Sequence, residues 1–244
     1  MLLRHEVVKA KLTDMIGYTV TPKEPGRYPG VVVLHAFNQT PDDVEVFARK
    51  FAENGFVALA PKYTDASDGV YVAVNALKKI KTLDNVDPIR VGLFGVSLGG
   101  TIALLTSTQE KVSFVIDVAG WVDLAHLYYF LSKFEKGTPQ RYVADLVKSS
   151  IGTPEESKDI YELSSPITYV DRMTGYILII HGDSDTMVPL EQSQLLLKKL
   201  LEKGFTAELH IIRGGGHLLK GKEDEVVNIA IDFLRRNGFL TKPV

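Results

Sequence analysis

Short apolar runs alternate along the chain with segments of helical periodicity, and this alternation limits the folds that are open to it. Residues 30–34, Gly-Val-Val-Val-Leu, are apolar almost throughout, which is typical of a strand buried on both faces of a parallel sheet. A helical pattern over residues 41–54 follows, opened by Thr40 and Pro41. The same unit recurs toward the C-terminus, which predicts a mostly parallel, doubly wound α/β sheet. Further strands are expected over residues 56–60, 90–94, 113–118, 176–180 and 207–212, and further helices over residues 69–83, 98–108, 190–203 and 223–237.

Two segments depart from this alternation. Residues 3–12 and 15–20 alternate between apolar and polar positions around Thr13-Asp14, which predicts an antiparallel hairpin at one edge of a sheet of about eight strands. Residues 120–174 look helical and partly aromatic, and they are too many for a plain crossover. We interpret them as a cap-like helical insertion over one end of the sheet. The 244 residues suit a single domain, 1–244, because α/β folds of this length often do not divide.

The composition excludes several kinds of site. The absence of cysteine excludes a disulfide framework and a thiolate nucleophile. No cluster has the spacing of metal ligands, so neither a metal nor another cofactor is expected. A net charge of −2 does not indicate a nucleic-acid partner. No apolar stretch approaches the length of a membrane span, and Arg4, Glu6 and Lys9 interrupt any signal-peptide core, so we expect a cytoplasmic protein.

The most specific motif is Gly95-Val96-Ser97-Leu98-Gly99, which lies between a predicted strand and a predicted helix. A serine on such a sharp turn has a strained backbone, and glycines two residues before and after it remove side chains that would collide. The turn lifts the hydroxyl above the sheet, and the N-terminus of the helix favours negative charge beside it. A chance match of glycine and serine is the alternative, but the setting favours a nucleophile elbow with Ser97 as the nucleophile.

A serine hydroxyl needs a base to remove its proton. His217 follows three glycines in the loop between the last predicted strand and the last predicted helix. Asp183 and Asp185 both follow the strand over residues 176–180, and either carboxylate could orient the imidazole or be a plain turn residue. The order of serine, acid and histidine along the chain is the one expected with a nucleophile elbow.

The sequences around Ser97, His217 and residues 181–189 resemble the α/β-hydrolase superfamily. More closely, residues 165–171 and 181–189 resemble the catalytic domain of prolyl oligopeptidase and acylaminoacyl peptidase relatives, and compact dienelactone hydrolase-like esterases are similar in length. The resemblance covers most of the chain from about residue 15. It implies the α/β-hydrolase fold, serine hydrolase activity, and an acid at the second aspartate of residues 181–189, which is Asp185.

An oxyanion hole needs two backbone N–H groups that point at the developing charge. Leu98, directly after the nucleophile, is the first expected donor. In the relatives the second donor follows a His-Gly pair, so the resemblance implies Phe37, although Ala36 stands where glycine is usual. We interpret His35 and His181 as structural residues that form hydrogen bonds.

The insertion contains several large apolar residues that could bind part of a substrate. Trp121, Tyr128 and Tyr129 are the candidate contacts, and plain packing against the sheet is the alternative. Charged residues also interrupt the insertion, which suggests a limited apolar wall and a preference for short acyl chains. These charged residues are Lys133, Glu135, Lys136, Arg141, Asp145 and Lys148.

The function predicted from these observations is hydrolysis of a small-molecule carboxylic ester. Three alternatives stay open. An acylaminoacyl or dipeptidyl-type peptidase usually has a β-propeller, for which this length leaves no room. A dienelactone-type hydrolase typically uses cysteine, which is absent. A non-catalytic binding protein on the same fold would not need a serine, an acid and a histidine in this order.

Overall fold

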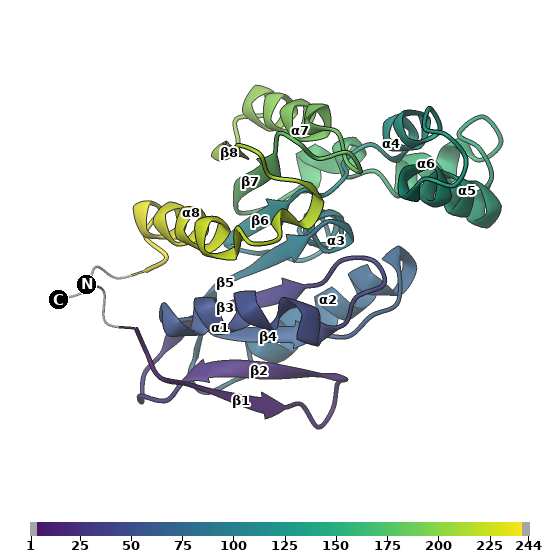
Figure 1. The fold of residues 1–244 in the computed structure, drawn as a ribbon. Helices are drawn as coiled ribbons and strands as arrows, with labels where there is room; N and C mark the ends of the chain where they lie inside the picture. The colour runs from purple at the N-terminus through teal and green to yellow at the C-terminus, as the bar shows by residue number, and fades with distance from the viewer. Residues whose placement is uncertain (1–3, 241–244) are drawn as a thin grey trace.

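Eight strands form one sheet in the computed structural model, which describes residues 4–240 (Figure 1). Their order is β1-β2-β4-β3-β5-β6-β7-β8. β1 (Val7–Lys11) and β4 (Val57–Pro61) both pair antiparallel with β2 (Gly17–Pro22), and the pairs from β4 to β8 are parallel. The other strands are β3 (Tyr28–Leu34), β5 (Val86–Val96), β6 (Phe114–Val118), β7 (Tyr176–Gly182) and β8 (Ala207–Ile212). The chain therefore has the predicted α/β-hydrolase architecture, with the antiparallel hairpin at one edge. Leu3, the first residue of the predicted hairpin, lies outside the described residues.

Helices cover both faces of this sheet. α1 (Glu45–Glu53), which the 3-10 turn η1 (Pro41–Val44) precedes, packs with α8 (Glu223–Arg236) on one face. α2 (Ala66–Ile80), α3 (Leu98–Thr106) and α7 (Leu190–Glu202) pack on the other. Val31 and Val33 of β3 contribute to the first core, and Val32 and Leu34 contribute to the second. Because side chains alternate across a strand, an apolar run is what a strand between two helical layers requires.

The insertion forms three helices between β6 and the 3-10 segment η2 (Pro166–Arg172), and Figure 1 shows them beyond the sheet and the helices that cover it. They are α4 (Leu124–Leu131), α5 (Pro139–Ile151) and α6 (Lys158–Leu163). These helices share a small core of their own, which Val188 joins from the loop after β7. The insertion is thus anchored beside the carboxyl ends of the parallel strands, where ligands bind in open α/β sheets.

The predicted helix over residues 69–83 begins earlier than expected, at Ala66. Asp65 caps it by accepting a hydrogen bond from the Ser67 backbone N–H, and Asp68 completes a capping box. Gly69 lies within the helix at a position where close packing leaves no room for a side chain. An added Cβ there would lie 2.3 Å from Cδ1 of Ile102. Within residues 4–240, no helix is both long and apolar enough to cross a membrane.

Candidate active site

Ser97 lies on the turn between β5 and α3, with φ 54° and ψ −118°. An L-residue adopts such a conformation only under strain of about 1–3 kcal/mol. The flanking glycines make this turn possible: a Cβ at Gly95 would lie 2.0 Å from the carbonyl oxygen of Gly99, and a Cβ at Gly99 would lie 2.3 Å from that of Leu34. The local sequence therefore forces the serine to the top of the sheet, as the motif predicts.

His217 reaches Ser97 from the far edge of the sheet. It begins the short segment η3 (His217–Leu219), which follows β8, and its Nε2 lies 2.8 Å from Oγ of Ser97. Leu218 and Leu219, the next two residues, have positive φ values of 68° and 49°. The glycine-rich loop and this unusual turn together position the imidazole over the serine.

Asp185 follows β7 and completes the line of contacts. Its Oδ2 lies 2.8 Å from Nδ1 of His217, and its Oδ1 accepts hydrogen bonds from the backbone N–H groups of Met187 and Val188. Asp183 instead accepts a hydrogen bond from the N–H of Gly214 at 2.7 Å. Of the two candidate acids, the structure brings Asp185 to the histidine, and Asp183 holds the neighbouring loop.

His181, at the end of β7, also contacts the carboxylate of Asp185. Its ring is fully buried, its Nε2 lies 2.9 Å from the carbonyl oxygen of Val188 and 3.3 Å from Oδ2 of Asp185, and its Nδ1 lies 2.6 Å from Oγ of Ser193. Burial by itself would raise the pKa of Asp185, but hydrogen bonds from His181 and His217 hold it well below its usual range. The carboxylate is therefore ionised at neutral pH.

Asp117, near the end of β6, is a second buried carboxylate close to His181. It is fully buried, and its Oδ1 accepts a hydrogen bond from the Gly120 N–H at 3.0 Å. Its Oδ2 has no hydrogen-bond partner among residues 4–240. Burial raises the pKa of Asp117 to about 7, although the nearby His181 and the Gly120 N–H oppose the shift. Sequence reasoning missed this residue, because its strand position alone does not distinguish it from a surface aspartate.

The two predicted oxyanion donors, Phe37 and Leu98, line the same cavity as Ser97. The backbone N–H groups of Leu98 and Phe37 have no acceptor within the described residues. The loop that contains Phe37 is tightly turned, because Asn38 has φ 56° and Ala36 accepts a hydrogen bond from the N–H of Gln39. Both N–H groups are therefore free to bind a ligand.

His35, which precedes this loop, is buried. Its Nδ1 lies 2.9 Å from the carbonyl oxygen of Ala36, and its ring stacks on Tyr63 with 3.9 Å between the ring centroids. Burial lowers the pKa of His35. These contacts fit a structural role.

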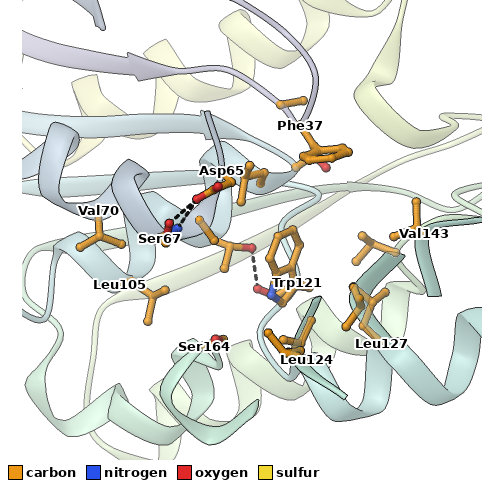
Figure 2. Close-up of a pocket in the computed structure, with 18 of the residues that line it drawn as sticks. Phe37, Asp65, Ser67, Val70, Leu105, Trp121, Leu124, Leu127, Val143 and Ser164 are labelled. Atoms are coloured by element: carbon orange, nitrogen blue, oxygen red, sulfur yellow. Dashed lines mark hydrogen bonds between the residues drawn. The ribbon is translucent and has the colours of Figure 1, made fainter. Parts of the chain in front are cut away.

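A cavity of about 920 Å³ opens beside Ser97 and His217. Figure 2 shows Val70 and Leu105 on one side of it and Leu127 and Val143 on the other. The lining is largely apolar, and α4, α5 and α6 contribute many of its residues. This volume is near the upper end of the range for pockets that bind small organic molecules.

The three aromatic residues predicted to contact substrate have different positions. Trp121 lines the cavity. Tyr128 packs against Tyr161, and the hydroxyl of Tyr129 donates to Glu155 at the surface, so both lie outside the lining. The reason is helical geometry: Leu124, Leu127 and Leu131, spaced three and four apart on α4, face the cavity and turn the tyrosines elsewhere.

The charged residues of the insertion do not limit its apolar wall as the sequence suggested, because none of them lines the cavity. The cavity face of α5 consists of Val143, Leu146, Val147, Ser150 and Ile151. Arg141 instead pairs with Asp145 on the outer surface. The helix is amphipathic, and the apolar wall is larger than a count of charges along the segment implied.

The polar groups that meet at the nucleophile are a serine hydroxyl, an imidazole, a carboxylate and two backbone N–H groups. Residues 4–240 contain no group of three or more histidine, cysteine, aspartate or glutamate side chains that could hold a metal ion. What this arrangement can do by itself is activate the hydroxyl as a nucleophile and stabilise negative charge beside it.

Residues 22–200 match the family model BD-FAE. The chain belongs to the BD-FAE family. A relative in this comparison is the uncharacterized peptidase YtmA of Bacillus subtilis, which is 27% identical over 198 residues that cover 75% of this chain and 74% of the relative. Relatives of this BD-FAE chain thus include a protein named as a peptidase.

Solved structures with a similar fold include an esterase and a peptidase. A propionate-bound esterase, Est2, of Thermogutta terrifontis superposes with a TM-score of 0.73 at 20% identity, covering 98% of this chain and 97% of the esterase. The acylaminoacyl peptidase of Pyrococcus horikoshii gives a TM-score of 0.76 at 17% identity and covers 100% of this chain but only 43% of the peptidase. At these identities the likeness establishes the α/β-hydrolase fold.

Proposed function

We propose that this protein is a serine hydrolase that cleaves carboxylic esters through an acyl-enzyme, with Ser97 as nucleophile, His217 as base and Asp185 as orienting acid. The observation that supports this best is the continuous line of contacts, with 2.8 Å between Ser97 Oγ and His217 Nε2 and 2.8 Å between His217 Nδ1 and Asp185 Oδ2. The first distance allows proton transfer from the serine to the imidazole, and the second lets the carboxylate orient the ring.

In the first half-reaction, Ser97 Oγ attacks the ester carbonyl carbon while His217 Nε2 accepts the hydroxyl proton. The carbonyl oxygen becomes an oxyanion, to which the N–H groups of Leu98 and Phe37 donate. Asp185 stabilises the imidazolium that forms. Collapse of the intermediate breaks the carbon–oxygen bond of the ester, and His217 gives its proton to the departing alcohol.

In the second half-reaction, water replaces the alcohol. His217 removes a proton from the water, whose oxygen attacks the acyl carbon, and a second oxyanion forms in the same place. The bond to Ser97 Oγ then breaks, and His217 returns the proton to the serine. The products are one carboxylic acid and one alcohol, and the enzyme regains its starting protonation state.

We propose short acyl groups as the preferred acyl side. The fold matches the esterase Est2, which has been solved with propionate and with butyrate. A short acyl group would occupy only part of the 920 Å³ cavity, so the remaining space is available to the alcohol. Each methylene group buried there adds about 0.8 kcal/mol of binding.

The second candidate is a peptidase, favoured by the name of the relative YtmA and by the match to acylaminoacyl peptidase. The experiment that separates the two compares kcat/KM for 4-nitrophenyl acetate, butyrate, octanoate and palmitate with that for acylaminoacyl and dipeptidyl anilides. We expect the optimum at acetate or butyrate and slow anilide cleavage. An anilide turned over as fast as butyrate would replace the esterase assignment, and an optimum at palmitate would overturn the preference for short acyl groups.

A further inference from the structure

Arg172 ends η2 at the edge of the cavity. Within residues 4–240 its guanidinium has no carboxylate within ion-pair distance and no hydrogen-bond partner. It lies over the ring of Tyr169, 5.4 Å from the centroid, which is a cation–π distance. The adjacent Asp171 is already paired with Lys203. The cavity edge therefore has an exposed cation, in contact with one aromatic ring, that nothing in the described part of the chain neutralises.

This cation lies far from the nucleophile. Thr174, two residues after Arg172, donates a hydrogen bond to the carbonyl oxygen of Ser107 at the C-terminal end of α3. Ser97 lies at the opposite end of α3, whose nine residues span about 13 Å. Because Leu105 and Gln109 also line the cavity, the open space runs along the length of this helix.

We name this stretch the α3 groove. Its lining includes Val70, Leu105, Gln109, Ile160, Leu163 and Arg172. Two of these apolar side chains are unusually open to solvent, Leu163 at 65% and Ile160 at 44%. Exposed apolar side chains gathered at the rim of a cavity favour an apolar occupant.

Outside the Ser97–His217 contact, the cavity lining contains two charged side chains, Arg172 and Asp65. The carboxylate of Asp65 accepts hydrogen bonds from Ser67 at the N-terminus of α2. Glu110, near the end of α3, pairs with Lys78. Gln109 also lines the cavity, and its side-chain amide has no partner among the described residues, so it can donate to a ligand in the groove.

We propose that the α3 groove binds the alcohol part of the ester, and that this part is an apolar chain or ring that ends in a carboxylate held by Arg172 and Gln109. The planar guanidinium can donate two parallel hydrogen bonds to a carboxylate. This inference rests on the proposed function, because it takes Ser97 as the point at which the ester is cleaved. It makes Arg172 a specificity-determining residue.

The test compares matched substrates. The acetate ester of ω-hydroxydodecanoic acid is compared with the acetate ester of the corresponding primary amide, which has the same length without the charge. The acetate esters of ω-hydroxybutanoic acid and its amide form a pair that is too short to reach the end of the groove. Release of acetate is measured for the wild-type protein, for Arg172→Gln and for the control Lys158→Gln, which removes an exposed cation of α6 outside the cavity lining.

We expect the wild-type protein and Lys158→Gln to have a kcat/KM roughly three- to tenfold higher for the long carboxylate than for the long amide, and no such preference within the short pair. Arg172→Gln should lose the preference. Equal rates for the two long esters in the wild-type protein would overturn the proposal.

Two further measurements separate this proposal from the proposed function. If the charge preference instead appears only with 4-nitrophenyl monoesters of dodecanedioic acid, the α3 groove binds the acyl side, and both our assignment to the alcohol and the short acyl preference are wrong. Calorimetric titration of Ser97→Ala with ω-hydroxydodecanoate measures binding without turnover. Binding to Ser97→Ala that is lost when Arg172→Gln is added would support the subsite. If the wild-type protein nevertheless cleaved none of the esters, the subsite would stand and the esterase assignment would be overturned.

Discussion

The carboxylate of Asp185 lies 2.8 Å from Nδ1 of His217, although 32 residues separate the two in the chain. The contact joins the loop after β7 to the loop after β8, and these strands are parallel neighbours at one edge of the sheet. Two backbone N–H groups donate to the other oxygen, Oδ1, and Nε2 of His181 lies 3.3 Å from Oδ2. Asp185 is therefore fixed independently of the histidine it contacts.

Asp185→Asn should lower kcat by roughly 10⁴-fold, because an amide can stabilise the wrong tautomer of His217. Asp183→Asn is the matched control, since Asp183 bonds to the Gly214 N–H and not to the imidazole. Its kcat should fall far less. Steady-state kinetics on a short-chain ester compares the two variants, and the reverse ranking would transfer the role of the acid to Asp183.

Ser97→Ala should abolish both turnover and labelling by an active-site phosphonate, leaving only the residual rate that binding and the oxyanion donors provide. The exposed Ser184, in the loop before Asp185, is a suitable control, and Ser184→Ala should still be labelled. Thermal unfolding of both variants checks that the fold is intact. If Ser97→Ala retained a tenth of the wild-type rate, another nucleophile would have to be sought.

Gly99→Ala should destabilise the protein by about 1–3 kcal/mol, because the added Cβ would lie 2.3 Å from the carbonyl oxygen of Leu34. The control is Gly216→Ala. Gly216 has φ −86° and open space around its Cβ position, so the change should cost less than about 0.5 kcal/mol. Urea unfolding measures both, and equal costs would show that the turn relaxes around the added methyl group without strain.

Asp117→Asn should flatten the pH dependence of stability between about pH 4 and 7. The pKa of Asp117 is raised to about 7 in the folded protein, whereas an unfolded aspartate ionises near pH 3.9. Between these values the folded state holds a proton that the unfolded state has lost. Stability therefore falls as pH rises through this window, by at most about 4 kcal/mol, and levels off above it.

The measurement for Asp117 is the difference in Tm between wild-type protein and Asp117→Asn from pH 4 to pH 8. The stability of the wild-type protein relative to the variant should decline up to about pH 7 and then stay constant. Asp185, whose pKa is lowered, is present in both proteins and acts in the opposite direction at lower pH. A difference in Tm that does not change with pH would mean that Asp117 is ionised throughout.

The positions of Ser97, Asp185 and His217 could be predicted because each follows a strand that the sequence predicts. In a parallel sheet the carboxyl ends of all the strands point the same way. Local sequence therefore determines the general location of the side chains that follow the strands. The glycines around Ser97 added a steric requirement that is also local. The choice between Asp183 and Asp185 could not be made from spacing, since two residues in one loop point in different directions for reasons set by distant partners such as Gly214.

The wall of the cavity could not be predicted in the same way. Which side of α4 faces the site depends on how that helix docks against α5 and the loop of Val188. Tyr128 and Tyr129 were predicted to contact substrate because they are aromatic, whereas the residue of α4 beside them that lines the cavity is Leu127. Arg172 was still less visible, because its importance lies in the absence of a partner among the described residues, which a linear sequence cannot show.

The position of β8 at the edge of the sheet makes the proposed hydrolase activity a stringent reporter of structural integrity. His217 is connected to the sheet through an edge strand, which has a neighbour on a single side, whereas Ser97 follows a strand flanked on both. If β8 detaches, we expect Ser97 to stay in place and most helical signal to persist, whereas the contact of His217 with Ser97 is lost. Active-site titration would then count only molecules with a complete sheet, and it should decline during storage or heating before circular dichroism does.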